Sequence, residues 1–165
     1  MTTQQILHDI QLVVFDFDGV FTNNKVIVSD AGSESVICDR SDGLGLSMIR
    51  SLGIKMLILS TETNPVVSHR ANKLGLECIQ GINDKLKKLI ELSKERRISL
   101  DNTAFVGNDI NDLDCLKAVG LPVVVADAYP QAKEAAKMIL THNGGEGAVR
   151  EFCEWLFENQ KPEIL

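Results

Sequence analysis

A length of 165 residues, 44% hydrophobic and 24% charged, fits a single globular domain over residues 1–165 and excludes a disordered or fibrous chain. The net charge of −6 excludes the concentrated basic surface that nucleic-acid binding requires. No apolar run approaches the roughly 20 residues that span a bilayer, so neither nucleic acid nor a membrane is an expected partner.

The first residues and the cysteines indicate a cytoplasmic protein. The N-terminal MTTQQILHDIQ lacks the basic start and long apolar run of a signal peptide. The four cysteines are far apart in the sequence, so we expect them to be reduced (Cys38, Cys78, Cys115, Cys153). The histidines lack zinc-site spacing and are interpreted as structural or surface residues (His8, His69, His142).

Short apolar runs alternate with amphipathic segments along the chain. We expect strands at 12–17, 55–59, 78–80, 103–106, 122–125 and 138–139. We expect helices at 43–52, 65–74, 84–96, 110–119, 130–136 and 147–159. This alternation predicts an α/β fold, a Rossmann-like parallel sheet flanked by helices.

Two segments need a separate interpretation. After the first strand, β-prone residues 25–28 and 35–39 flank the turn-forming residues 29–33, which predicts a β-hairpin. Further on, the basic run 85–97 carries apolar residues at helical spacing, so we interpret most of its charges as the solvated face of a helix.

A pair of acids ends the first strand. Asp16 and Asp18 alternate on an extended chain, so both carboxylates point the same way at the edge where open α/β sheets bind ligands. Two like charges so close need a cation or a proton between them, which suggests Mg²⁺. The alternative is that the two acids only cap a loop.

Three later motifs follow strands in the same manner. Ser60 and Thr61 can donate hydrogen bonds to a phosphoryl oxygen or cap the next helix. Lys85 can supply a point charge to a phosphate or lie on the surface. Finally, Gly107 opens a turn with several oxygen-bearing side chains, more than helix capping needs (Asn108, Asp109, Asn111, Asp112).

These four motifs, in this order, resemble those of the haloacid dehalogenase superfamily over nearly the whole chain. The resemblance implies that Asp16 is the nucleophile that forms an aspartyl-phosphate and that Asp18 is the general acid and base. It implies that Ser60 and Lys85 hold the phosphoryl oxygens. It also implies that Mg²⁺ is bound by Asp16, the backbone carbonyl of Asp18 and the fourth motif (Asn108, Asp109, Asp112).

The segment between Asp18 and Ser60 has room for a hairpin and one helix but not for a cap domain. It is similar to the capless branch that dephosphorylates 3-deoxy-octulosonate 8-phosphate and nine-carbon ulosonate 9-phosphates, the sugar acids of lipopolysaccharide and sialic acid biosynthesis. That likeness implies a small phosphorylated sugar-acid substrate and a homotetramer joined by the hairpins. A monomer whose hairpin folds on its own sheet is the alternative. The implied substrate-binding residues are Thr22, Asp42, Thr61, Glu62, Lys73 and Arg150.

The fourth motif departs from the branch at one position. Asn108 stands where branch members commonly have aspartate, and an amide offers an oxygen without a charge. Glu62 and Lys73 resemble the pair that the nine-carbon enzymes place near their substrate. Two functions therefore remain open: an active sugar-acid phosphatase, or a weakly active or inactive assembly module associated with an acylneuraminate cytidylyltransferase.

Overall fold

The structure, a computed structural model, describes residues 10–160. Its centre is a six-stranded, fully parallel sheet in the order β5-β4-β1-β6-β7-β8. The strands are β1 (Leu12–Phe15), β4 (Lys55–Leu59), β5 (Glu77–Ile79), β6 (Thr103–Gly107), β7 (Leu121–Val124) and β8 (Met138–Ile139).

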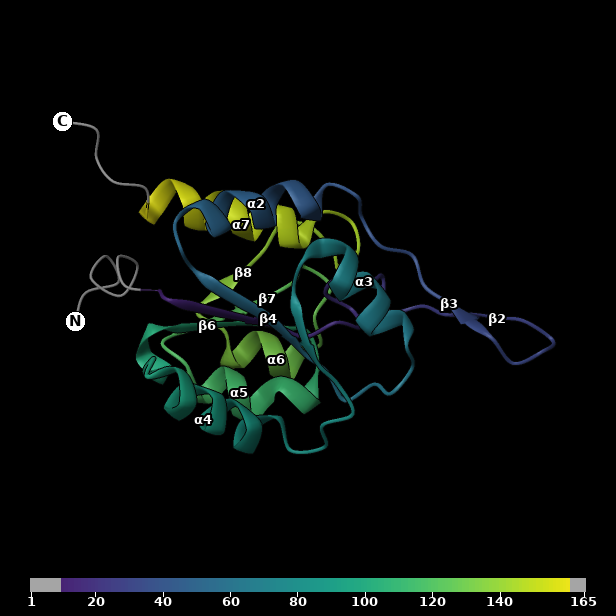
Figure 1. The fold of residues 1–165 in the computed structure, drawn as a ribbon, viewed down its shortest axis with the longest axis horizontal. Coiled ribbons are helices and arrows are strands. Elements are labelled where there is room, and N and C mark those ends of the chain that lie inside the picture. Colours follow the sequence, from purple (N-terminus) through teal and green to yellow (C-terminus); the bar gives the residue numbers. More distant parts are fainter. Residues whose placement is uncertain (1–9, 161–165) are drawn as a thin grey trace.

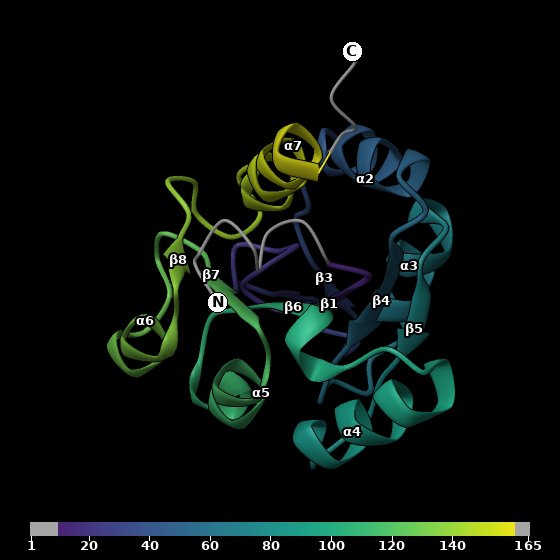
Figure 2. The same ribbon diagram turned by 90° about the vertical axis from the view of Figure 1, so that its left-hand side faces the viewer.

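Helices cover both faces of this sheet, so the predicted α/β fold class is confirmed (Figures 1 and 2). One face carries α2 (Asp42–Ser51), α3 (Val66–Leu74) and α7 (Ala148–Gln160). The other carries α4 (Lys85–Arg96), α5 (Leu113–Ala118) and α6 (Pro130–Ala135). Short 3-10 turns lie at Leu100–Asn102 and Ile110–Asp112.

The central strand β1 is the most apolar part of the sheet. All four of its side chains are fully buried, which is expected of a parallel strand covered on both faces. β4 pairs with one side of β1 and β6 with the other, so the chain reverses direction across the sheet at β1. The carboxyl ends of these three strands therefore meet at the topological switch point, where open α/β sheets bind ligands.

The predicted hairpin forms, with shorter strands than its β-prone residues suggested: β2 (Ile27–Val28) and β3 (Glu34–Ser35). It makes a separate two-stranded sheet that projects from the body, as Figure 1 shows, and does not join the main sheet. Among the described residues it is the main insertion between β1 and α2, so no cap domain is present there.

Most helices and strands of the main sheet lie within one residue of the expected bounds, and two elements differ by more. β1 ends at Phe15, not at Phe17, because the chain turns at the acid pair. The helix expected over 110–119 is split, because Asp109 and Asp112 form a capping box that closes a 3-10 turn before α5 begins.

Other expectations concern the cysteines, the termini and membranes. All four cysteines are free thiols, as predicted. The N-terminal segment 1–11, from which we predicted that the chain has no signal peptide, lies almost wholly outside the described residues, and so does His8. Within residues 10–160, every helix is too short or too polar to cross a membrane.

Candidate active site

Asp16 is the first residue beyond β1 and is 4% exposed. Its N–H donates to the carbonyl of Val106 at 2.9 Å, which continues the β1–β6 ladder by one residue and fixes the start of the turn. Phe17 points into the core and stacks on Phe21, so Asp16 and Asp18 face away from it, as the alternation predicted.

Lys85 brings two distant acids together. Its ammonium lies 2.8 Å from Asp16 Oδ1 and 2.8 Å from Asp112 Oδ1, and all three side chains are at least 95% buried. Asp112 Oδ2 accepts from the N–H groups of Asn108 and Asp109, at 2.9 and 3.3 Å. Both oxygens of Asp112 are therefore engaged in holding Lys85 and the turn that follows β6.

Burial and charge act against each other in this triad. Burial and the nearby Asp112 raise the pKa of Asp16 to about 7, although Lys85 opposes the shift. Burial would lower the pKa of Lys85, but Asp16 and Asp112 together raise it, so the lysine stays charged. One buried cation beside two carboxylates leaves negative charge that a further cation can balance.

Asn108 completes the arrangement around Asp16. The end of its side-chain amide lies 3.0 Å from the carbonyl oxygen of Asp18 and 3.2 Å from Asp16 Oδ2. With its nitrogen turned toward them, the amide donates to both oxygens. With its oxygen turned toward them, three oxygens converge, which is favourable only with a cation between them.

A small cavity opens in front of these oxygens. Its volume is about 80 Å³, and every residue that lines it has a polar or acidic side chain (Asp16, Asp18, Asn24, Thr61, Asn108, Asp109, Asn111). Within residues 10–160, no three His, Cys, Asp or Glu side chains are grouped to hold a metal. Any ion here would depend on the Asn108 amide and the Asp18 carbonyl as well as on carboxylates.

The ends of β4 and β6 supply the remaining residues of the predicted motifs. Ser60 is buried, and its hydroxyl oxygen accepts from the N–H of Glu62 at 3.1 Å. Thr61 lines the cavity, and the Asp109 carboxylate, which also lines it, accepts from the N–H of Ile110. Burial raises the pKa of Asp18, and the negative charge of the nearby Glu62 raises it further.

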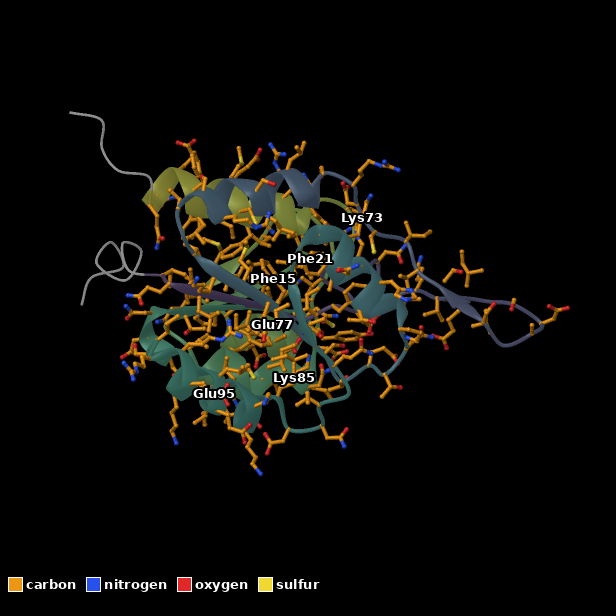
Figure 3. The ribbon with its side chains drawn as sticks, viewed as in Figure 1. Phe15, Phe21, Lys73, Glu77, Lys85 and Glu95 are labelled. Atoms are coloured by element: carbon orange, nitrogen blue, oxygen red, sulfur yellow. The ribbon has the colours of Figure 1, made fainter. Side chains whose placement is uncertain are left out.

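Four of the predicted substrate-binding residues do not line the cavity (Thr22, Asp42, Lys73, Arg150). Thr22 is fully buried and accepts from the N–H groups of Gly19 and Asn24, at 3.1 Å each, so it shapes the turn after the acid pair. Lys73 is exposed on α3, on the opposite side of the sheet from Lys85 (Figure 3).

Asp42 and Arg150 meet each other between α2 and α7. The N–H of Arg150 donates to Asp42 Oδ1 at 3.3 Å, while the Arg150 guanidinium pairs with Glu154. The structure thus joins these two predicted residues through the packing of two helices and does not bring them to the cavity.

Three residues near the site had no role predicted from the sequence. Asn24 and Asn111 line the cavity, and Glu34, from hairpin strand β3, accepts from the Asn64 amide at 3.2 Å and raises the pKa of Asp18. Asn111 lay within the fourth motif and could have been included. The position of Glu34 depends on how the hairpin folds back, which no local pattern encodes.

Comparisons with known proteins agree with this geometry. A family model described as haloacid dehalogenase-like hydrolase matches residues 59–152. The 3-deoxy-D-manno-octulosonate 8-phosphate phosphatase of Haemophilus influenzae is 31% identical over 158 residues, 95% of this chain and 88% of that protein.

Solved structures extend the comparison. The corresponding Moraxella catarrhalis phosphatase, solved with magnesium, phosphate and the sugar acid KDO, is 34% identical, with a TM-score of 0.91 over 95% of this chain and 91% of that one. A Streptomyces avermitilis protein described as a HAD family hydrolase is 45% identical, with a TM-score of 0.87 over 89% and 84%. The chain therefore belongs to the haloacid dehalogenase-like hydrolases and is a phosphatase of that family.

Proposed function

We propose that this chain is a Mg²⁺-dependent phosphomonoesterase that removes phosphate from a phosphorylated sugar acid through an aspartyl-phosphate on Asp16. The observation that carries the proposal is the convergence of Asp16 Oδ2, the Asp18 carbonyl and the Asn108 amide, with separations of 3.0 and 3.2 Å. Neighbouring ligands of an octahedral Mg²⁺ lie about 3 Å apart, so these groups fit the ion.

The proposed metal ligands are therefore narrower than the predicted set. Asp16, Asp18 and Asn108 would hold the ion, and Asp109 lies on the same cavity wall. Asp112 would act through Lys85, because its oxygens are already engaged. When bound, Mg²⁺ would offset the negative charge of the phosphoryl group, the main requirement of phosphoryl transfer.

The first step is proposed to be attack by Asp16. An Asp16 oxygen forms a bond to phosphorus while the bond from phosphorus to the sugar oxygen breaks. The Lys85 ammonium, 2.8 Å from Asp16 Oδ1, favours the ionised form of the nucleophile against the effect of burial and can donate to a phosphoryl oxygen. Ser60 at the end of β4 is proposed to donate to another.

Asp18 is proposed to move the protons. Burial and then Glu62 raise its pKa, which favours a protonated carboxyl that can donate to the leaving sugar oxygen. In the second step the ionised Asp18 takes a proton from water as the water oxygen bonds to phosphorus. The bond between phosphorus and Asp16 then breaks, which releases inorganic phosphate and restores the nucleophile.

The substrate class is supported by the relatives. The phosphatases of H. influenzae and M. catarrhalis are named for 3-deoxy-D-manno-octulosonate 8-phosphate, and the second was solved with a sugar acid bound. The resemblance of Glu62 and Lys73 to the pair of the nine-carbon enzymes favours a nine-carbon ulosonate 9-phosphate instead, and of the two only Glu62 lies near Asp18. We also propose that the chain acts as a homotetramer, because the hairpin is exposed and apolar.

A phosphate-release assay tests the proposed function. The eight- and nine-carbon sugar-acid phosphates are compared with hexose phosphates, each with Mg²⁺ and with EDTA. We expect Mg²⁺-dependent release from a sugar-acid phosphate and a loss of about 10² to 10⁴-fold in kcat for Asp18→Asn. Equal, trace release from every substrate would favour the weakly active assembly module.

A further inference from the structure

A single carboxylate accepts several hydrogen bonds from the start of the loop between β8 and α7. Glu151, in the first turn of α7, accepts from the Thr141 N–H at 2.9 and 3.0 Å and from the Thr141 hydroxyl at 2.9 Å. It also accepts from the His142 N–H at 2.9 Å and lies 2.8 Å from His142 Nδ1. Burial would raise the pKa of Glu151, but these hydrogen bonds lower it, so the carboxylate is ionised.

The residues that follow His142 are fixed against the turn after the acid pair. The N–H of Gly145 donates to the Val20 carbonyl at 3.0 Å, and the N–H of Gly144 donates to Asp127 at 2.9 Å. A methyl group added at Gly144 would lie only 1.9 Å from the Gly19 carbonyl oxygen. The two backbones are therefore in direct contact, which only glycine allows.

Gly19 in turn packs against Asn108, one of the proposed metal ligands. It follows Asp18 directly, and a methyl group added at Gly19 would lie 2.0 Å from the Asn108 amide nitrogen. Continuous packing thus runs from Glu151, through the loop 141–147, to Gly19 and Asn108. Since the Asp18 carbonyl and the Asn108 amide must converge to within 3.0 Å, a shift of this loop would change their separation.

We propose that Glu151 is a positioning residue for the Mg²⁺ site, acting through the loop 141–147 on the Asp18 carbonyl and the Asn108 amide. The inference rests on the proposed function, because it concerns the ion that the phosphatase would use. Glu151 itself lies in α7, away from the residues of the cavity wall. Its role is to fix backbone position, as outer-shell groups do around other metal sites.

The test substitutes Glu151→Gln, which keeps the shape of the side chain but leaves one acceptor oxygen for several donors. Outer-shell changes cost about 10 to 100-fold in metal affinity, and a residue one layer further out should cost less, about three- to tenfold. Glu154→Gln is the matched control, because Glu154 lies three residues on in α7 and pairs only with Arg150 among the contacts described. Mg²⁺ dissociation constants are measured by calorimetric titration, and unfolding by urea in EDTA.

A rise in the Mg²⁺ dissociation constant for Glu151→Gln alone supports the inference. If Glu151→Gln has the same Mg²⁺ dissociation constant as the parent, the inference is wrong, whether or not the variant is less stable. The proposed function is unaffected by that result. A parent that binds no Mg²⁺ overturns both. If Glu151→Gln does not fold, Thr141→Val should raise the constant about twofold by removing one donor, and Thr141→Ser should restore it; a Thr141→Val value equal to that of Thr141→Ser overturns the inference.

Discussion

At the proposed site, Asn108 would set how strongly the ion is bound. Its amide lies 3.2 Å from Asp16 Oδ2, so an aspartate there would place two carboxylates in contact. Such a pair repels without a cation and binds Mg²⁺ more tightly with one. At the proposed site, the amide of Asn108 would therefore lower the Mg²⁺ affinity and would avoid a repulsive pair of carboxylates when no ion is bound.

We predict that Asn108→Asp lowers the Mg²⁺ concentration for half-maximal activity about tenfold. The same variant should unfold at lower urea than the parent in EDTA. Asn111→Asp is the control, since it adds the same charge to the same cavity wall from an exposed position. Equal effects of the two substitutions on the magnesium titration would show that only net charge matters and that Asn108 does not bind the ion.

Asp42 is a buried carboxyl group outside the proposed chemistry. It is 1% exposed, and within residues 10–160 its Oδ2 and Arg70 Nε are the buried side-chain atoms without a hydrogen-bond partner. Burial is the main cause that raises the pKa of Asp42 from 3.8 to about 7, and the negative charge of Asp39 adds to it. The folded protein therefore keeps a proton on Asp42 that the unfolded chain loses near pH 4.

This shift predicts a pH dependence of stability. Because the folded pKa is raised, the free energy of unfolding should fall as pH rises from about 4 to 7 and then level off, by up to about 4 kcal/mol. Asp42→Asn mimics the protonated form and should lose that part of the slope. Urea unfolding in EDTA between pH 5 and 8 checks this, with Asp101→Asn as control, because Asp101 is an exposed carboxylate in the 3-10 turn before β6. Parallel slopes for parent and Asp42→Asn would contradict it.

At the scale of elements, the hairpin is the described segment whose exposed apolar residues are hardest to account for in a monomer. Val26, Ile27, Val28 and Ile37 are 52 to 61% exposed, and β2 and β3 pair only with each other. A lone two-stranded hairpin is marginal in water, and contiguous exposed apolar residues mark interaction surfaces. The alternative in which the hairpin folds on its own sheet is not what the structure shows.

We predict that the parent is the proposed tetramer in light scattering and that Val26→Lys combined with Val28→Lys yields a smaller species. Since both side chains are more than half exposed, the secondary structure of each subunit should be unchanged by circular dichroism. Ile139→Lys, which replaces a similarly exposed residue in β8, should leave the tetramer intact. A monomeric parent would refute the tetramer.

For the molecule as a whole, local patterns predicted the sheet well but the site only in part. Apolar runs located the strands, and the acid pair, Ser60 and Lys85 were assigned to the sheet edge that the structure shows. The Lys85–Asp112 contact was missed, because it joins residues 27 positions apart and depends on how α4 packs beside α5 and the turn before it. Asp42 and Arg150 were assigned to substrate by resemblance, whereas the contact between them depends on how α2 packs against α7.

The most direct test of an aspartyl-phosphate mechanism is to trap the intermediate. The enzyme is mixed with a sugar-acid phosphate and Mg²⁺, quenched in acid within one turnover, and its peptides are mapped by mass spectrometry. We predict a phosphoryl group on Asp16 in the parent, and neither phosphopeptide nor turnover in Asp16→Asn, because an amide cannot form the acyl phosphate. Phosphoryl transfer to another residue, or an Asp16→Asn variant that keeps a substantial share of parent turnover, would contradict the mechanism.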